Sequence, residues 1–277
     1  MQTLIYIITG GFGLIVGSFL NAVIYRLYLS ESAFRGRSHC PYCNKTLKWY
    51  ELVPVFSFIV QRGRCRSCAH VISWQYPLVE LATGGLFIFL ISNSQFQIFN
   101  EFLPAQTFKL LFMAFIGSGL IVIFAYDLKH YIIPDRVLIP LISATLLAEI
   151  FGIWDLNFIW NFELGIFHFG NVFNGLALGV LSALPFAAIH FISKGRAMGF
   201  GDVKLSFFMG ILLGYPAVIV AMFIAFVLGA IIGIGLMVAG KKSLQSKVPF
   251  GPFLILGVFL ALFWSEELIV FYFNLLL

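Results

Sequence analysis

Two aspartates stand at positions where an apolar chain ordinarily avoids charge. Asp127 follows a long apolar run in FAYDLKHYIIPD, and Asp202 precedes another in MGFGDVKLSFF. An ionisable side chain within or beside a membrane-spanning helix is costly, so it marks a functional site by default. Two carboxylates held together share a proton, and one can polarise a carbonyl while the other takes a proton from water. The pair therefore predicts acid–base hydrolysis.

The residues around Asp202 fit this chemistry. Gly199 and Gly201 carry no side chain, so backbone and substrate can approach the carboxylate closely. Lys204 could pair with Asp202 and support the site, although a lysine at this depth can also extend its amine to the membrane interface.

Each aspartate also has a purely structural interpretation. Asp202 could cap the N-terminus of a helix, a position that the preceding glycine suits. Asp127 could pair with Lys129 or Arg196 at a helix end. Asp135 follows a proline, and we expect it to cap the next helix rather than to take part in chemistry.

All four cysteines lie in one polar loop, as two Cys-x-x-Cys pairs. This arrangement is typical of a closed tetrahedral zinc site, which has a structural role. A short polar loop cannot build a core of its own, so a bound metal would stabilise it. The neighbouring His39 and His70 are expected to lie outside the ligand set. The predicted ligands are Cys40, Cys43, Cys65 and Cys68.

Composition defines the elements that must position these residues. Hydrophobic residues make up 61% of the chain and charged residues 10%, with a mean hydropathy of +0.99, whereas a soluble domain carries about 25% charge. We therefore predict an all-α integral membrane protein with about eight transmembrane helices and a small cytoplasmic zinc-binding loop domain. The predicted spans are 3–26, 77–94, 105–126, 137–154, 171–193, 203–214, 216–240 and 250–264.

This reading divides the chain into a first transmembrane helix, 1–27, the four-cysteine domain, 28–76, and a multi-helix membrane domain, 77–277. Eight spans place every lysine and arginine except Lys109 on one face, which the positive-inside rule makes cytoplasmic. The N-terminus and the segment 155–170 then lie outside, and both aspartates lie at the cytoplasmic boundary. The net charge of +5 follows from this topology, and nothing points to nucleic-acid binding.

Several motifs together resemble one family. They are GLIVGSFLNAVIYRL, the paired-cysteine loop with ELVPVFSFIVQRGRCRSC and ISWQYPLVELATG, the aspartate before IIPD, GFGDVK, and VPFGPFLILG. In this order they resemble the bacterial type IV prepilin peptidases, also called leader peptidase/N-methyltransferases, which are GxGD-type aspartic proteases. The segment 155–170 is longer than the family pattern, and it is remote from the aspartates.

The resemblance implies a bifunctional enzyme of the bacterial cytoplasmic (inner) membrane. It would cut the basic leader from type IV prepilins or type II secretion pseudopilins after a glycine, and then methylate the new N-terminal residue with S-adenosylmethionine. The catalytic aspartates would be Asp127 and Asp202, and the zinc ligands would be the four cysteines. Gly63 matches a glycine of the family's methyltransferase region. The chain has no glycine-rich Rossmann fingerprint for the methyl donor.

Glu80 stays open at this point, because a carboxylate inside the second span could serve an interhelical hydrogen bond or a second site. Three alternatives also stay open. The chain could be a peptidase without methyltransferase activity, although its intact four-cysteine loop argues against this. It could be a proton-coupled transporter, which would need charge nearer the bilayer centre than either aspartate. It could also be a membrane-anchored zinc-ribbon adaptor with inert aspartates.

Overall fold

The computed structural model describes residues 2–32, 35–93, 104–151, 153–154, 169–240 and 248–276. It divides into two compact units, Met1–Ala125 (unit 1) and Tyr126–Leu277 (unit 2), and the boundary falls within one long helix. Most of the predicted outer segment 155–170 and the basic residues Lys241, Lys242 and Lys247 lie outside the described residues.

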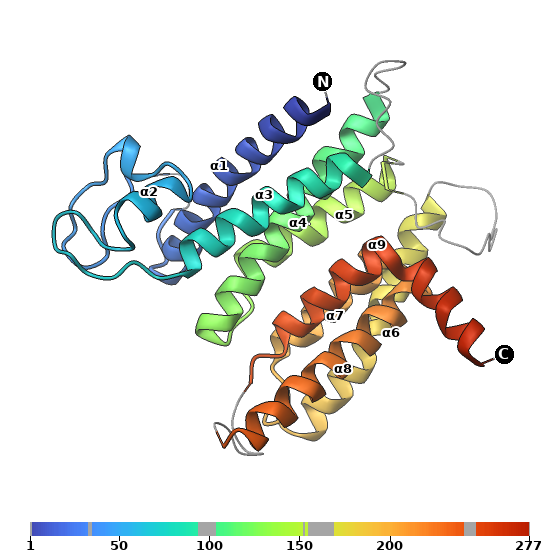
Figure 1. Cartoon of the computed structure of the whole chain (residues 1–277). Helices are drawn as coiled ribbons and strands as arrows, with labels where there is room; N and C mark the ends of the chain where they lie inside the picture. The colour runs from blue at the N-terminus through green and yellow to red at the C-terminus, as the bar shows by residue number, and fades with distance from the viewer. Residues whose placement is uncertain are drawn as a thin grey trace. The chain divides into compact units, whose positions relative to one another are not determined.

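The described residues are mostly helical (Figure 1). The exceptions are the cysteine loop, which contains two isolated β-bridges, and the short connections between helices. The helices are α1 (Gln2–Tyr28), η1 (Trp49–Glu51), α2 (Phe56–Val60), α3 (Gln75–Asn93), α4 (Pro104–His130), α5 (Asp135–Ile150), α6 (Phe169–Ile192), α7 (Phe200–Leu213), α8 (Ala217–Val238) and α9 (Gly251–Leu276).

A helix lies at each of the eight predicted spans, which confirms the all-helical fold class. Six of these helices are long and apolar enough to cross a membrane, namely α1, α3, α4, α6, α8 and α9. The other two are shorter, with 16 residues in α5 and 14 in α7. The last predicted span ended at 264, where α9 instead kinks at Trp264 and continues.

Unit 1 is built on a close antiparallel pairing of α1 and α3. A β-carbon added to Gly13 would lie 2.9 Å from the Cα of Gly84, and one added to Gly17 would lie 2.6 Å from the Cα of Glu80. Small residues let the backbones of membrane helices pack closely. This van der Waals packing stabilises the pair, because in lipid there is no hydrophobic driving force between helices. The polar loop between the two helices carries the four cysteines.

Unit 2 is organised around α7, which contacts α5, α6, α8 and α9 (Figure 1). Glycines again set the closest approaches, since Gly210 of α7 faces Ser182 and Leu178 of α6, and Gly257 of α9 faces the carbonyl of Ala221 in α8. Most side chains of α7 are buried. A short helix can lie at membrane depth when protein rather than lipid surrounds it.

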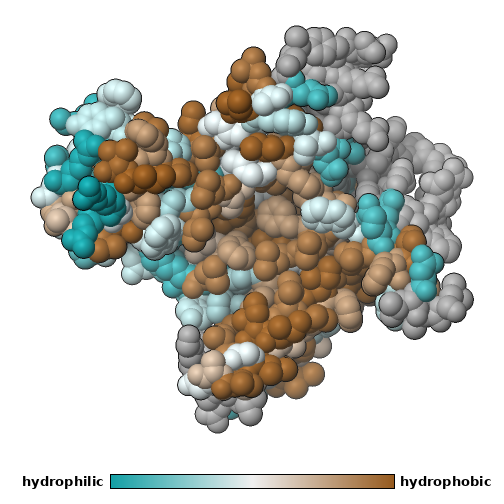
Figure 2. Space-filling model, in the orientation of Figure 1, coloured by the Kyte–Doolittle hydropathy of each residue, from teal (hydrophilic) through white to brown (hydrophobic). Residues whose placement is uncertain are grey.

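The surface separates by polarity. Figure 2 shows polar residues gathered over the four-cysteine loop and a broad apolar surface over α8 and α9. The side chains of α8 that face outward are large and apolar, including Ile219, Phe223, Ile231 and Ile234. Exposed apolar helix faces of this extent are those of a multi-pass membrane protein.

Candidate active site

The structure brings the two predicted aspartates together within unit 2. Asp127 lies in the last turn of α4 with a side chain that is only 4% exposed. Asp202 lies in the first turn of α7 and is partly buried. The charge of Asp202 acts on the Asp127 carboxyl. Asp127 was predicted just beyond its span, but α4 continues to His130 and carries this side chain inside the helix.

Glycine backbone surrounds the pair. The amide of Gly251, at the start of α9, faces the Asp127 carboxylate, and a β-carbon on Gly251 would lie 2.5 Å from its Oδ2 atom. The amide of Gly199 faces Asp202 in the same way. The buried Ile133 lies against both Gly201 and Gly251 and so joins the starts of α7 and α9. Sequence reasoning gave no role to Gly251 or Ile133, although the glycine in VPFGPF was a usable signal.

Two structural interpretations of the charged residues are wrong in detail. The N-cap of α7 is Gly199 and that of α5 is Pro134, so neither Asp202 nor Asp135 is a cap. Lys204 pairs with Asp135 rather than with Asp202, and it also lies over the ring of Phe200. This exposed ion pair connects the first turn of α5 to the N-terminal part of α7.

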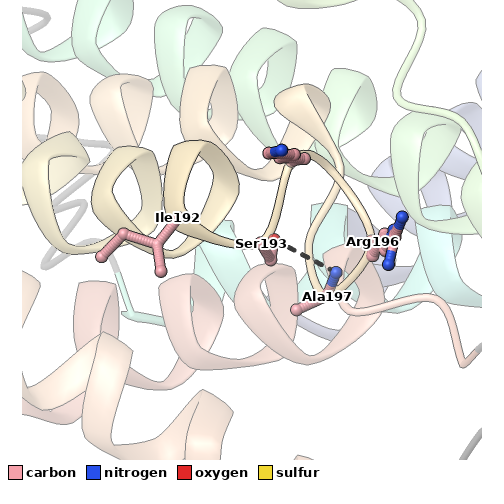
Figure 3. A pocket seen from close by; sticks show the side chains of 5 residues that line it. Ile192, Ser193, Arg196 and Ala197 are labelled. Carbon is pink, nitrogen blue, oxygen red and sulfur yellow. Dashed lines mark hydrogen bonds between the residues drawn. The ribbon is translucent and has the colours of Figure 1, made fainter.

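The turn that leads into Asp202 is firmly bonded. Ser193 Oγ accepts a hydrogen bond from the amide of Ala197, and a ring nitrogen of His190 lies 2.9 Å from the carbonyl of Met198. A shallow depression of about 550 Å³ lies beside this turn, with Ile192 and Arg196 on opposite sides of it (Figure 3). The approach to the GFGD segment is therefore a defined surface rather than a loose loop.

The four cysteines form a single cluster in unit 1. Their sulfur atoms all lie within 4.8 Å of one another, and Cys40 Sγ lies 3.9 Å from Cys68 Sγ. Tetrahedral zinc with Zn–S bonds of about 2.3 Å needs sulfurs about 3.8 Å apart, so the cluster could hold a metal such as zinc. His39 and His70 are outside it and contact the rings of Tyr25 and Tyr42.

The two cysteine pairs have the same local structure. In each, the amide of the residue after the second cysteine donates to the carbonyl of the first, as Asn44 does to Cys40 and Ala69 to Cys65. An isolated β-bridge closes each turn. The backbone amides of Cys68 and Ser67 lower the pKa of the Cys65 thiol to about 6, which favours the thiolate that metals bind.

Gly63 and Glu80 both hydrogen-bond the backbone of the segment between Val55 and Phe58. Gly63 is buried with φ +65°, and its amide donates to the carbonyl of Phe58 in α2. Glu80 is buried in α3, and its Oε2 atom accepts a hydrogen bond of 2.7 Å from the amide of Val55. Glu80 therefore bonds a loop amide, and the side chain of Ser18 in α1 also hydrogen-bonds its carboxyl group.

The structure also contains a buried carboxylate, Glu149, that the sequence did not predict as a site residue. Glu149, in the last turn of α5, is fully buried, and neither carboxylate oxygen has a hydrogen-bond partner among the residues that the structure describes. Both oxygens face Gly175 of α6. The surrounding sequence LLAEIFG carries no motif that would have marked this residue.

Comparison with known proteins identifies the family to which this chain belongs. Residues 12–94 match the model of the bacterial peptidase A24 N-terminal domain, and residues 114–234 match that of the type IV leader peptidase family. A curated prepilin leader peptidase/N-methyltransferase of Bacillus subtilis is 32% identical over 96% of this chain and 97% of its own length. The chain belongs to the type IV leader peptidase family.

Other type IV leader peptidases align over a similar extent. Proteins with the same name from Aeromonas hydrophila and Pseudomonas aeruginosa are 29% and 27% identical, over 93% and 92% of this chain and 90% and 89% of their own lengths. No solved structure matches. The family match spans both the cysteine loop and the two aspartates, as the resemblance of the motifs predicted.

Proposed function

We propose that this chain is a membrane aspartic endopeptidase that removes the leader from type IV prepilins or type II secretion pseudopilins and then N-methylates the new N-terminus. The observation that carries the peptidase proposal is the buried Asp127 carboxylate, which lies under the charge of Asp202 and beside glycine backbone at the starts of α7 and α9. The names of the relatives support the same pair of activities.

The proposed cleavage uses one proton shared by Asp127 and Asp202. The ionised carboxylate takes a proton from water, whose oxygen attacks the scissile carbonyl carbon, while the protonated carboxyl hydrogen-bonds the carbonyl oxygen. Collapse of the tetrahedral intermediate breaks the C–N bond, and the amine nitrogen takes up a proton from the pair. Gly199, Gly201 and Lys204 support this site by leaving space and by fixing the start of α7.

Asparagine substitutions test the dyad. Asp127→Asn and Asp202→Asn should each abolish leader cleavage while the protein still inserts, because an amide can neither share the proton nor activate water. Asp135→Asn is the matched control, since Asp135 lies near the site and its ion pair among the described residues is with Lys204; this variant should keep substantial activity. A normal cleavage rate in either dyad variant, measured with purified protein and a prepilin, would show that the assignment is wrong.

The proposed location is the bacterial cytoplasmic membrane, with the N-terminus outside and the aspartates and cysteine loop at the cytoplasmic face. The distribution of lysine and arginine supports this orientation. Reporter cysteines at Asn157 and Ser246, in a chain free of other cysteines, test it. An impermeant thiol reagent outside the cell should label position 157 and spare position 246.

For the methyltransferase we propose that residues 28–76 form the responsible region. The four cysteines would hold a structural zinc ion, and Gly63 and Glu80 would act by fixing the segment between the cysteine pairs. S-adenosylmethionine would supply an electrophilic methyl group to the amine that cleavage releases. Mass spectrometry of a prepilin processed by the purified protein, with and without S-adenosylmethionine, distinguishes this bifunctional enzyme from a peptidase alone, a transporter or an adaptor.

A further inference from the structure

The loop between the two cysteine pairs contains a strongly apolar stretch, LVPVFSFIV at residues 52–60 (the wedge segment). It is bordered by Lys48, Trp49 and Tyr50 on one side and by Arg62 and Arg64 on the other. Cationic and aromatic residues flank segments that enter a bilayer. We infer that the wedge segment inserts into the lipid leaflet next to the four-cysteine loop, and so anchors that loop to the membrane.

Two hydrogen bonds tie the wedge segment to the membrane helices. The Oε2 atom of Glu80 in α3 accepts from the amide of Val55 at 2.7 Å, and the Oγ atom of Ser18 in α1 donates to the carbonyl of Leu52 at 3.4 Å. Both partners lie inside apolar helices rather than in the loops that connect them. The position of the wedge segment is thus set from within the helix pair.

Helix length gives the depth of these contacts. α3 has 19 residues and is therefore about 28 Å long, close to the hydrocarbon thickness of about 30 Å. Its first residue, Gln75, consequently lies near the membrane boundary, and Glu80 lies roughly 7 Å inside it. Interfacial apolar segments bury about 5–10 Å into a leaflet, so the bond from Val55 is at the depth that insertion requires.

The wedge segment also satisfies its own backbone. Irregular backbone at membrane depth must find partners in protein, because lipid offers none. The amide of Ser57 donates to the carbonyl of Val53, and that of Ile59 to the carbonyl of Val55. Glu80 provides the acceptor for the amide of Val55, whose left-handed φ of +59° puts it outside a regular helix. A carboxylate inside α3 is thereby explained by the backbone group that it serves.

The side chains of the wedge segment face outward. Phe56, Ile59 and Val60 are 64%, 65% and 49% exposed, and Trp49 beside them is 79% exposed. Figure 2 shows an apolar patch over α2 within the otherwise polar surface of this loop. Such a patch on a loop already bonded to lipid-embedded helices continues the apolar surface of α1 and α3, where Phe19 and Leu78 are also exposed.

Lipid rather than a soluble protein partner is the occupant that the charges favour. Arg62 and Arg64 are exposed directly after the wedge segment, and Lys48 is exposed before it. These cations are placed to meet phosphate groups when the apolar residues between them enter the leaflet. The result is a short re-entrant element that holds the cysteine cluster at the membrane surface.

Depth-dependent quenching tests the insertion on the full chain. A genetically encoded fluorescent amino acid replaces Ile59, or in a matched control Tyr42, which is equally exposed at 65% but lies in the first cysteine turn. Each protein is placed in phosphatidylcholine–phosphatidylglycerol nanodiscs containing lipid with a nitroxide on its acyl chain. Emission from position 59 should fall at least twofold more than emission from position 42.

A second variant separates insertion from burial by protein. Phe56→Glu places a charge in the wedge segment and should abolish the excess quenching at position 59, while thermal unfolding and zinc content report whether the loop still folds. Equal quenching at positions 59 and 42 would overturn the inference. A blue-shifted emission at position 59 without quenching would overturn it too, because protein and not lipid would then cover the segment.

Discussion

Gly251 offers the sharpest test of the site, because its backbone touches the more buried aspartate. In Gly251→Ala the new β-carbon would lie 2.5 Å from Asp127 Oδ2 and 3.2 Å from its Cγ. Ordinary contact begins at 3.4 Å, so the carboxyl group must move by about 0.9 Å. A misplacement of about 1 Å in a reacting group costs roughly 100-fold in rate. We therefore expect kcat/KM for leader cleavage to fall about 100-fold, or about 2.7 kcal/mol.

Alanine substitutions at two further glycines should give smaller losses of cleavage than Gly251→Ala. Gly201→Ala would bring a β-carbon to 3.1 Å from Ile133 Cβ, a milder conflict that should cost less than Gly251→Ala. No atom of the described residues lies within 4 Å of a β-carbon added to Gly233 in α8, so Gly233→Ala should cleave at the normal rate. Alanine in a helix stabilises it relative to glycine, so thermal unfolding should show folded protein in each case.

The assay is cleavage of a purified prepilin in detergent, followed by gel shift and checked by mass spectrometry of the new N-terminus. Folded Gly251→Ala protein that cleaves within threefold of the unmodified enzyme would show that Gly251 does not position Asp127. Impairment of Gly233→Ala as strong as that of Gly251→Ala would show the same, since the loss would then not report on the aspartate.

Three other outcomes follow from the structure. Cys40→Ser and Cys65→Ser should each reduce bound zinc from one per chain to near zero by elemental analysis, with methylation reduced more than cleavage; zinc retained in both would contradict the site. Glu149→Leu should raise the thermal unfolding temperature by several degrees, because the buried Glu149 carboxyl has no partner among the described residues, and such a group costs about 1–3 kcal/mol; a lower temperature would refute this account. The exposed pair of Lys204 and Asp135 is worth no more than about 1 kcal/mol, so Lys204→Asp and Asp135→Lys should each reduce cleavage by about fivefold or less. Their combination should restore the rate, and no recovery would mean that the ion pair does not position α7.

The parts of this protein that sequence reasoning predicted are those set by local chemistry. A Cys-x-x-Cys turn directs two thiolates to one point whatever surrounds it, so the cluster of Cys40 and its partners was predictable from spacing. Long apolar runs form helices in lipid because no other partner exists for their amides. The positions of Asp127 and Asp202 followed from the ends of those runs.

What could not be predicted depends on which helices approach one another. Gly251 is distant in sequence from Asp127, and only the packing of unit 2 brings its amide to the carboxylate. Lys204 had a nearer candidate in Asp202, but the helix geometry gives it Asp135. Glu149 lies in an apolar helix with no motif, and its burial follows from α6 placing Gly175 against it. Tertiary contact, rather than propensity, decides all three.

The pairing of α1 with α3 also fixes an order of events during synthesis. Gly17 meets Glu80, yet the whole cysteine loop is translated between these two helices. At about 5–20 residues per second the ribosome needs roughly 2–10 s for that stretch. Both cysteine turns are local and can close on a metal ion within this interval, whereas the amide of Val55 has no acceptor until Glu80 emerges. If the four cysteines bind zinc as proposed, metal supply at the moment of translation, and not only in the mature enzyme, decides whether the loop is folded when α3 is made.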